Sequence, residues 1–318
     1  EIMPSLVGSE MCIRDRVMNI KSLFMAISAI ALTSAVSVAQ TRTIEHEYSE
    51  FDAISVSDGF KVTLVEKDGY NAKFKVSDAL ESCLECYVKG GTLYIGLDDK
   101  SIPKEVKKSF KGKNSEGPVL EATIYVSSLN SITLNDDCTF SSSNSLNSGK
   151  FKMDLSGNSS IANLNVNAES AVISVGKKAK LSSFNVKAGD NVTVNADGSA
   201  TVVMEYSAKT LNVNNSGSAD LAVNGQCETA SVATDNSAKL SLSGKANSLK
   251  VTGKGGSSKI DAVTMSVDDV TVSLDGADLT VTPGKNLSLD LGKGASVCYS
   301  GDPVIKIVKI QNATVTRK

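Results

Sequence analysis

A repeat of about 19 residues runs through the second half of this 318-residue chain and limits the folds that it can adopt. Six segments align when they are taken to begin at Val192, Leu211, Ala230, Leu249, Val270 and Leu287. In each segment apolar residues recur at every second position, and a small residue follows a turn rich in Gly, Asn and Ser. In the first segment the five columns are Val192, Val194, Ala200 (the small residue), Val202 and Met204. Alternation at period two indicates strands, and a fixed repeat of this length indicates strands that stack coil upon coil.

The sequence therefore predicts an all-β fold, a parallel β-solenoid of about nine ~19-residue coils with two or three short strands in each. The period continues more loosely upstream, where 132–134, 151–153 and 173–175 can each open a coil, and 304–310 and 313–315 would close the last one. With rungs ~4.8 Å apart, such a stack is roughly 43 Å long. Polar residues between the apolar columns would face outward and form side-chain ladders. An antiparallel β-sandwich shares the alternation but gives no reason for six segments to keep one register.

Residues 40–126 differ from the repeats and are predicted to form a strand-rich N-terminal cap, followed by the solenoid and its closing strands over 127–318. Eight aromatic residues gather in the cap region: Phe51, Phe60, Tyr70, Phe74, Tyr87, Tyr94, Phe110 and Tyr125. Alternating segments at 60–65 and 72–76 indicate strands, and the Gly-Gly pair at 90–91 indicates a hairpin turn. A region of this kind would cover the apolar edge of the first coil.

The first 39 residues are expected to lie outside the fold. Residues 1–17 show no folding pattern and resemble translated adaptor sequence, so we expect them to be a non-native artefact. Residues 18–39 are typical of a signal peptide, with an apolar run at 23–36 and small residues at a cleavage site. The apolar run is shorter than the ~20 residues that a membrane-spanning helix needs. We therefore expect an exported protein that begins at Gln40, has no transmembrane segment, and is located in the periplasm, the outer cell envelope or outside the cell.

Composition argues against several classes of function. With 33 basic and 35 acidic residues the chain is nearly neutral, whereas nucleic-acid binding depends largely on Lys and Arg. His46 is the single histidine, and Arg42 and Arg317 are the only arginines after residue 39. Catalytic triads, histidine-rich metal sites and arginine-dependent lyase sites therefore have few residues to draw on. No catalytic, cofactor-binding or metal-binding residue is predicted, and we expect no enzymatic activity.

A carbohydrate-active enzyme, either a polysaccharide lyase or a hydrolase, is the main alternative, and a carbohydrate-binding module is another. Adjacent acidic residues occur at Asp98–Asp99, Asp136–Asp137 and Asp268–Asp269. Glycoside hydrolysis needs two carboxyl groups roughly 5–10 Å apart across a groove, whereas neighbours on a strand point to opposite faces. A carbohydrate-binding module usually needs exposed aromatic rings, and in the regular coils only Tyr206 and Tyr299 are aromatic.

The cysteines are predicted to be structural. Cys83 and Cys86 form a C-x-x-C motif, but neither flank suggests the helix start that a redox motif requires. Export favours a disulfide, either within this pair or from one member to Cys138. Cys227 and Cys298 fall at different offsets in their coils, so they cannot stack on each other and are expected to be buried small apolar residues.

Residues 98–118 interrupt the strand pattern with a run of lysines that includes Lys104, Lys107, Lys108, Lys111 and Lys113. One interpretation is a basic loop that contacts acidic glycan or lipopolysaccharide. Because the loop has no arginine and, apart from Phe110, no interleaved aromatic residue, a solvated loop fits the pattern better.

Several short motifs follow one another in a definite order: FDAISV at 51–56, GFKVTL at 59–64, GGTLYI at 90–95, LNSITL at 129–134 and YSGDP at 299–303. In this order they resemble the autotransporter-adhesin head domain family, also called the head GIN domain. The resemblance implies an exported β-helical protein of Bacteroidetes-type bacteria with an adhesive or envelope role. We therefore expect a non-catalytic, adhesin-like scaffold without cofactors, which binds a cell-surface or envelope component, such as a glycan, by surface contact.

Overall fold

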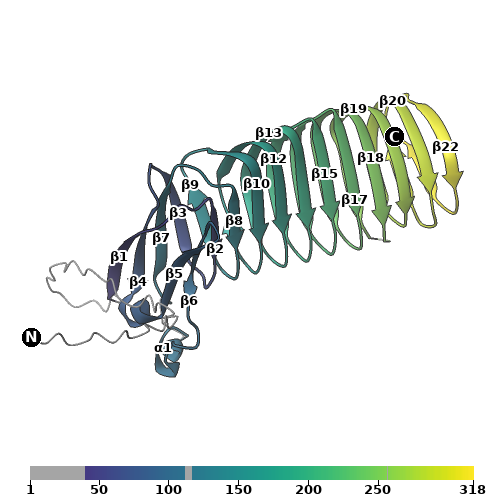
Figure 1. Ribbon diagram of the computed structural model, residues 1–318. Coiled ribbons are helices and arrows are strands. Elements are labelled where there is room, and N and C mark those ends of the chain that lie inside the picture. Colours follow the sequence, from purple (N-terminus) through teal and green to yellow (C-terminus); the bar gives the residue numbers. More distant parts are fainter. Residues whose placement is uncertain (1–39, 112–116, 256) are drawn as a thin grey trace, which may run out of the picture. The chain divides into compact units, whose positions relative to one another are not determined.

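The computed structural model describes residues 40–111, 117–255 and 257–318. The artefact expected at 1–17 and the signal peptide expected at 18–39 lie outside the described residues and stay predictions. Within the described residues the chain forms a parallel β-solenoid of about 9 turns, as Figure 1 shows. This confirms the predicted fold class.

The solenoid has two long strand-bearing faces, here called face A and face B, joined by a short third stretch of strand. The strands that lie wholly on face A are β2 (Ala53–Val56), β8 (Ser131–Leu134), β15 (Thr210–Asn215), β17 (Thr229–Thr234) and β22 (Val304–Ile310). Those that begin on face B are β3 (Lys61–Glu66), β9 (Thr139–Ser142), β11 (Ser160–Ile161), β14 (Thr201–Ser207), β16 (Asp220–Gln226), β21 (Ser296–Tyr299) and β23 (Thr314–Arg317). Longer strands bend and end on face A: β10 (Leu146–Leu155), β12 (Leu164–Val175), β13 (Lys180–Ala196), β18 (Lys239–Lys254), β19 (Lys259–Asp275) and β20 (Asp278–Leu291).

The aligned columns of the sequence are the stacked columns of the structure. Val192 pairs with Leu211, which pairs with Ala230, and the same column continues to Leu287. The small-residue column that starts at Ala200 is buried in every coil. Outward polar residues form the expected ladders, for example Asn214 Nδ2 to Asn195 Oδ1 at 2.8 Å. Parallel stacking places equivalent positions over one another, and this is why one alignment predicts both the strands and their partners.

Upstream of Val192 the register differs from the expectation by two residues. Ile132 pairs with Met153 rather than with Phe151, and Ile173 pairs with Val194 rather than with Val192. A shift of two leaves every apolar residue on the same face of its strand, so the alternation alone does not distinguish the two registers.

The cap region adds strands to the first coil, which itself starts inside that region. On face A, β6 (Thr92–Leu97) pairs in parallel with β2, and β5 (Leu84–Lys89) forms an antiparallel hairpin with β6. On face B, β3 is extended by β7 (Leu120–Val126), β4 (Asn71–Ser77) and β1 (Thr41–Glu47). A 3-10 helix, Asp78–Cys83, and a short helix, α1 (Lys104–Ser109), connect these strands.

Most of the aromatic residues in the cap region fill its interior. Phe51, Phe60 and Phe74 are buried, and Tyr70 packs partly against them. Tyr87 and Tyr94 are exposed on the β5–β6 hairpin, and Tyr125 is half-buried with Lys67 Nζ 5.5 Å from the centre of its ring. The aromatic cluster therefore packs as a core and does not line an open cleft.

The C-terminal end continues the stack with two more parallel strands. β22 pairs with β20, and β23 pairs with β21, so both closing segments pair across the last coil as expected. All seven residues of β22 are exposed, including Val304 and Ile307. The strand also carries two lysines, Lys306 and Lys309.

Candidate functional site

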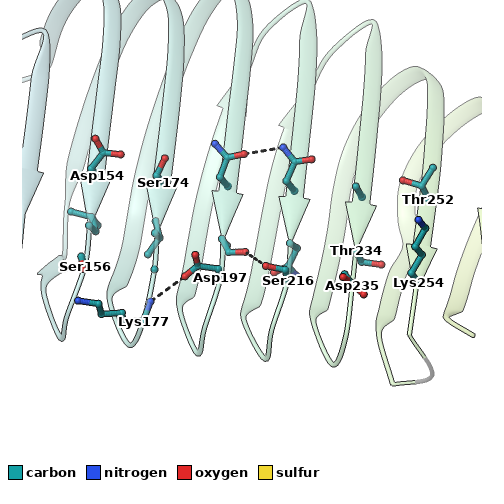
Figure 2. Close-up of a pocket in the computed structure, with 18 of the residues that line it drawn as sticks. Asp154, Ser156, Ser174, Lys177, Asp197, Ser216, Thr234, Asp235, Thr252 and Lys254 are labelled. Atoms are coloured by element: carbon teal, nitrogen blue, oxygen red, sulfur yellow. Dashed lines mark hydrogen bonds between the residues drawn. The ribbon is translucent and has the colours of Figure 1, made fainter.

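A groove of about 900 Å³ crosses six neighbouring coils where their strands end on face A (Figure 2). The strands that line it are β10, β12, β13, β15, β17 and β18, and the turns that follow them contribute too. The groove runs across the strands and therefore along the stack. Its walls are short side chains and backbone, so it is an open channel that suits an extended ligand.

One outward row of side chains follows the length of the groove. The paired positions in order are Asp154, Ser174, Asn195, Asn214, Ala233 and Thr252. Figure 2 shows Asp154, Ser174 and Thr252 at one level of their strands, with Ser216 and Asp235 among the turn residues below them. Because each position pairs with the next through parallel backbone hydrogen bonds, the row has a fixed spacing of ~4.8 Å.

The groove lies over a stretch where the inner column beneath it becomes small and polar. Along the stack this column is Leu134, Leu155, Val175, Ala196, Asn215, Thr234, Gly253, Leu274 and Leu291. The four central members, from Ala196 to Gly253, all line the groove. These smaller side chains fill less of the interior beneath the end of face A. We attribute the groove to this decrease in buried side-chain volume.

Two of these inner residues carry buried polar atoms. Asn215 is 2% exposed and Thr234 is 4% exposed. Asn215 Nδ2 donates to the Lys239 carbonyl at 2.8 Å, whereas Asn215 Oδ1 and Thr234 Oγ1 have no hydrogen-bond partner among the described residues. An unpaired buried hydroxyl costs stability, because it loses its hydrogen bonds to water on folding.

Thr234→Val is therefore expected to raise the free energy of unfolding by about 1 kcal/mol, since it replaces an unpaired hydroxyl by a methyl group of similar shape. Urea unfolding followed by circular dichroism measures the change. Thr271→Val, on an exposed position of face A, makes the same substitution without burial and should be close to neutral. A lower free energy of unfolding for Thr234→Val would show that the Thr234 hydroxyl has a hydrogen-bond partner in the folded protein.

The charges in the groove nearly cancel. Asp154, Asp197 and Asp235 are opposed by Lys177 and Lys254, which leaves one negative charge (three acids against two bases). Asp154 also makes an ion pair with a lysine on the neighbouring outward position, at 2.7 Å, and Asp197 Oδ1 accepts the Lys177 amide hydrogen at 3.3 Å. In the part of the chain that the structure describes, no group of three His, Cys, Asp or Glu side chains is arranged to hold a metal ion. The groove thus has little electrostatic attraction for a polyanion or a polycation.

The acidic pairs singled out in the sequence lie at separate places and none lines the groove. Asp98 accepts the Ser101 hydroxyl at 2.5 Å, and this hydrogen bond lowers the pKa of the Asp98 carboxyl. Asp137 Oδ1 accepts an amide hydrogen from Asn158 at 2.7 Å. Asp268 is in an ion pair with Lys285 at 2.9 Å. Each pair has its own local partners, and no two pairs converge on a common substrate position.

The remaining candidate side chains also have structural surroundings. Arg42 is in an ion pair with Asp78, and Arg317 with Asp302 at 3.3 Å. The His46 ring lies 6.0 Å from the Tyr48 ring. In the lysine-rich loop, α1 forms where only a loop was expected, and Lys107 is in an ion pair with Asp99 at 2.8 Å. Residues 112–116 of this loop are outside the described ranges.

All five cysteines in the described residues are free thiols, so the structure does not form the disulfide expected from Cys83, Cys86 and Cys138. Each of the three has its own environment. Cys83 is buried at the end of the 3-10 helix, and Cys86 lies beside Tyr48. Cys138 contacts the backbone of Gly59 and Phe60 on the first coil. The pairing of these cysteines remains a prediction.

Cys227 and Cys298 do not pair with each other, as expected, but both are only partly buried. Cys227 Sγ lies 3.3 Å from the Tyr206 hydroxyl. Cys227 therefore lies at the margin of the core, whereas Cys298 lies in an outward column between Thr280 and Thr316.

Burial raises the pKa of the Cys138 thiol to about 11, although backbone amides of the first coil act in the opposite direction. At pH 8 its thiolate fraction should be about 100-fold lower than that of an ordinary thiol, and we expect iodoacetamide to label it only after unfolding. Mass spectrometry of the labelled protein, with and without urea, tests this. Rapid labelling of the native protein would contradict the prediction. Labelling in urea that requires a reductant would reveal a disulfide.

The sequence analysis missed the exposed aromatic pair because it considered only the regular coils. Tyr206 is buried and Tyr299 partly buried, so neither offers an open ring. Tyr87 and Tyr94 are instead 48% and 36% exposed, and their rings stack with centroids 5.2 Å apart and an interplanar angle of 20°. The alternation of the two hairpin strands predicts this exposure, because it places Tyr87 and Tyr94 on the outward side of β5 and β6.

The chain matches one family over most of its length. The family is described as "Putative auto-transporter adhesin, head GIN domain", and it matches residues 50–184, 169–240 and 184–303. No curated protein is significantly similar in sequence to this chain. No helix of the described residues is long and apolar enough to cross a membrane.

Solved structures with a similar course of the chain include three from Parabacteroides. A "putative adhesin" from Parabacteroides merdae ATCC 43184 is 17% identical, with 88% of this chain and 96% of that chain covered and a TM-score of 0.45. A "putative adhesin" from Parabacteroides distasonis ATCC 8503 is 18% identical, with 88% and 98% covered and a TM-score of 0.46. A "putative lipid binding protein" from the same strain is 16% identical, with 87% and 96% covered and a TM-score of 0.42. On the strength of the family match, the chain belongs to the auto-transporter adhesin head GIN domain family.

Proposed function

We propose that the protein is an exported, non-catalytic scaffold that binds a cell-surface or envelope component in an adhesin-like manner, with the face A groove as its contact site. The observation that carries this proposal is the outward row of polar side chains that follows the groove across six coils. Membership of a family named for adhesin head domains supports it.

The row is suited to binding because its side chains are held in place before a ligand arrives. Backbone pairing fixes the spacing of the strands, and ladder bonds such as Asn214 to Asn195 restrict the side chains. Binding to such a surface loses little conformational entropy, so weak contacts along a row can add up to useful affinity. The enzyme alternative has less support, because the predicted acidic pairs lie apart and outside the groove.

Obstructing the row should weaken binding strongly. Ala233 lies within it, and Ala233→Arg would place a long side chain across the groove. We expect retention of the chain from residue 40 onward on envelope fractions or whole cells to fall about tenfold or more, which corresponds to ~1.4 kcal/mol. The assay is a pull-down in which the bound fraction is quantified.

The matched control is Ala222→Arg, which makes the same change on an exposed position of face B. This variant should bind as the unmodified chain does. Equal retention of both variants would refute the groove as the contact site, and no retention of the unmodified chain on any envelope or cell sample would refute the proposed function.

A further inference from the structure

We infer that Tyr87, Tyr94 and the groove row of face A form one extended site for a linear, uncharged glycan that lies along the stack. This inference rests on the proposed function and specifies its ligand. The combination of exposed aromatic rings with a neutral polar ladder carries it.

The aromatic pair and the groove belong to the same row of face A. Tyr87 pairs with Tyr94 across the hairpin, and Tyr94 pairs with Ser55 of β2. Ser55 pairs with Thr133 of β8, and Thr133 pairs with Asp154, where the groove begins. In Figure 1, β6, β2, β8 and β10 follow one another along this side of the solenoid. Segments distant in sequence thus produce one continuous line of outward side chains.

The positions between the rings and the groove are small. Ser55 and Thr133 are short side chains, so no bulky residue of the row separates Tyr94 from Asp154. Three pairing steps span this interval, which corresponds to ~14 Å, and eight steps from Tyr94 to Thr252 correspond to ~38 Å. A site of this length suits a chain of several sugar units better than a single small molecule.

The two tyrosines offer the apolar contact that sugar rings use. The carbon-bound hydrogens on one face of a pyranose pack on an aromatic ring, and a tyrosine hydroxyl can add a hydrogen bond at the edge. Stacking holds both rings in place, so little side-chain entropy is lost when a ligand covers them. Three other large apolar residues are exposed among the described strands between the hairpin and β20: Val172, Val203 and Val263. They are aliphatic, so they offer no ring for a sugar to pack on.

The rest of the row offers hydrogen bonds that suit hydroxyl groups. Ser174 presents a hydroxyl that can both donate and accept, whereas Thr252 Oγ1 donates to the Val232 carbonyl at 3.0 Å and keeps only its capacity to accept. The bond from Asn214 to Asn195 uses one donor of the first amide and one acceptor of the second. Each amide therefore retains further donor and acceptor capacity on the outward side. Sugar hydroxyls match such groups, since they also donate and accept.

The charge distribution selects an uncharged chain. The groove carries three acids and two bases, and Asp154 has its own lysine partner. A phosphate-rich or uronic-acid polymer would need a basic row, because its charges repel one another and the acids of the groove. The described residues of the lysine-rich loop, 98–111 and 117–118, do not line the groove and do not supply that charge.

Affinity electrophoresis of the chain from residue 40 onward tests the inference. The gels contain arabinoxylan, galactomannan, dextran or mixed-linkage β-glucan, with polygalacturonate as the acidic comparison. We expect at least one neutral polymer to retard the protein. Tyr87→Ala with Tyr94→Ala should weaken that retardation about tenfold, whereas Tyr87→Phe with Tyr94→Phe should keep it within about threefold, since the rings remain. Thr133→Arg should also weaken it, and Ala222→Arg on face B should not.

Several results would overturn the inference: retardation by none of the neutral polymers, retardation by polygalacturonate alone, or retardation that neither the alanine pair nor Thr133→Arg reduces. Urea unfolding of each variant confirms that the fold is intact, and the phenylalanine pair controls for any change in the hairpin. Retention on cells that Ala233→Arg abolishes, but that neutral polymers do not compete, would leave the proposed function standing while the glycan assignment fails.

Discussion

Gly244→Ala is expected to lower the free energy of unfolding by roughly 3 kcal/mol or more, a large share of the stability of a typical domain. Gly244 has a φ of +102°, which residues with a Cβ rarely adopt. A Cβ added there would lie within the contact radius of the Gly225 carbonyl oxygen in the coil beneath. Gly225 itself pairs with Tyr206, so the close approach involves three successive rungs.

The clash cannot be relieved cheaply because the opposing atoms are backbone. Moving them apart would break the parallel pairing between neighbouring coils. Gly149→Ala is the control: this glycine is exposed, and nothing lies within 4 Å of an added Cβ. The control should change the urea midpoint little. Similar midpoints for the two variants, by circular dichroism, would show that the coils separate at Gly244 more readily than the structure indicates.

Val232→Asp should be comparably severe, with a loss of about 4 kcal/mol, because it places a carboxyl group in the solenoid interior without a partner. Val232 is buried between Val213 and Val251 in one inner column. Its neighbour Ser231 points outward from the same strand. Ser231→Asp therefore adds the same charge at an exposed site and should be close to neutral.

The pH dependence separates burial of charge from loss of volume. Burial would raise the folded-state pKa of the new carboxyl above its unfolded value. The variant should then be least destabilised at low pH, where the group is protonated in both states, and should lose stability as the pH rises through the raised pKa. Urea midpoints of Val232→Asp, measured relative to the parent protein across this range, test the sign. A pH-independent deficit would indicate that packing alone is responsible.

The sequence predicts the regular coils well because stacking repeats a single environment. Val194, Val213 and Val232 occupy equivalent positions, so one alignment predicts their burial and their partners together. The prediction weakens where coils differ in length. Between β12 and β13 the register shifts at Ala168, and upstream of Val192 the sequence alignment is displaced by two residues. Period-two alternation carries no information about such a shift.

The candidate site is less predictable because it depends on contacts between distant segments. The groove follows from a change in side-chain size along an inner column, at Ala196 and Gly253 among others, which a scan for apolar residues does not register as a feature. The tyrosine pair joins the row only because β6 is placed next to β2 and β2 next to β8. No local pattern in the sequence indicates that order.

The repeated coils also bear on how a protein of this kind can vary in length. In such a stack each unit contacts chiefly the one before and the one after it, so a whole coil can be gained or lost while the units at both ends keep their environments. Removing a single residue would instead turn the following strand over and expose its apolar side. The family matches residues 50–184 and 169–240, which overlap, as expected of a pattern that recurs within the chain. Chains of this kind can therefore differ by whole coils, and so in the length of their outer faces along the stack, while they keep the same fold.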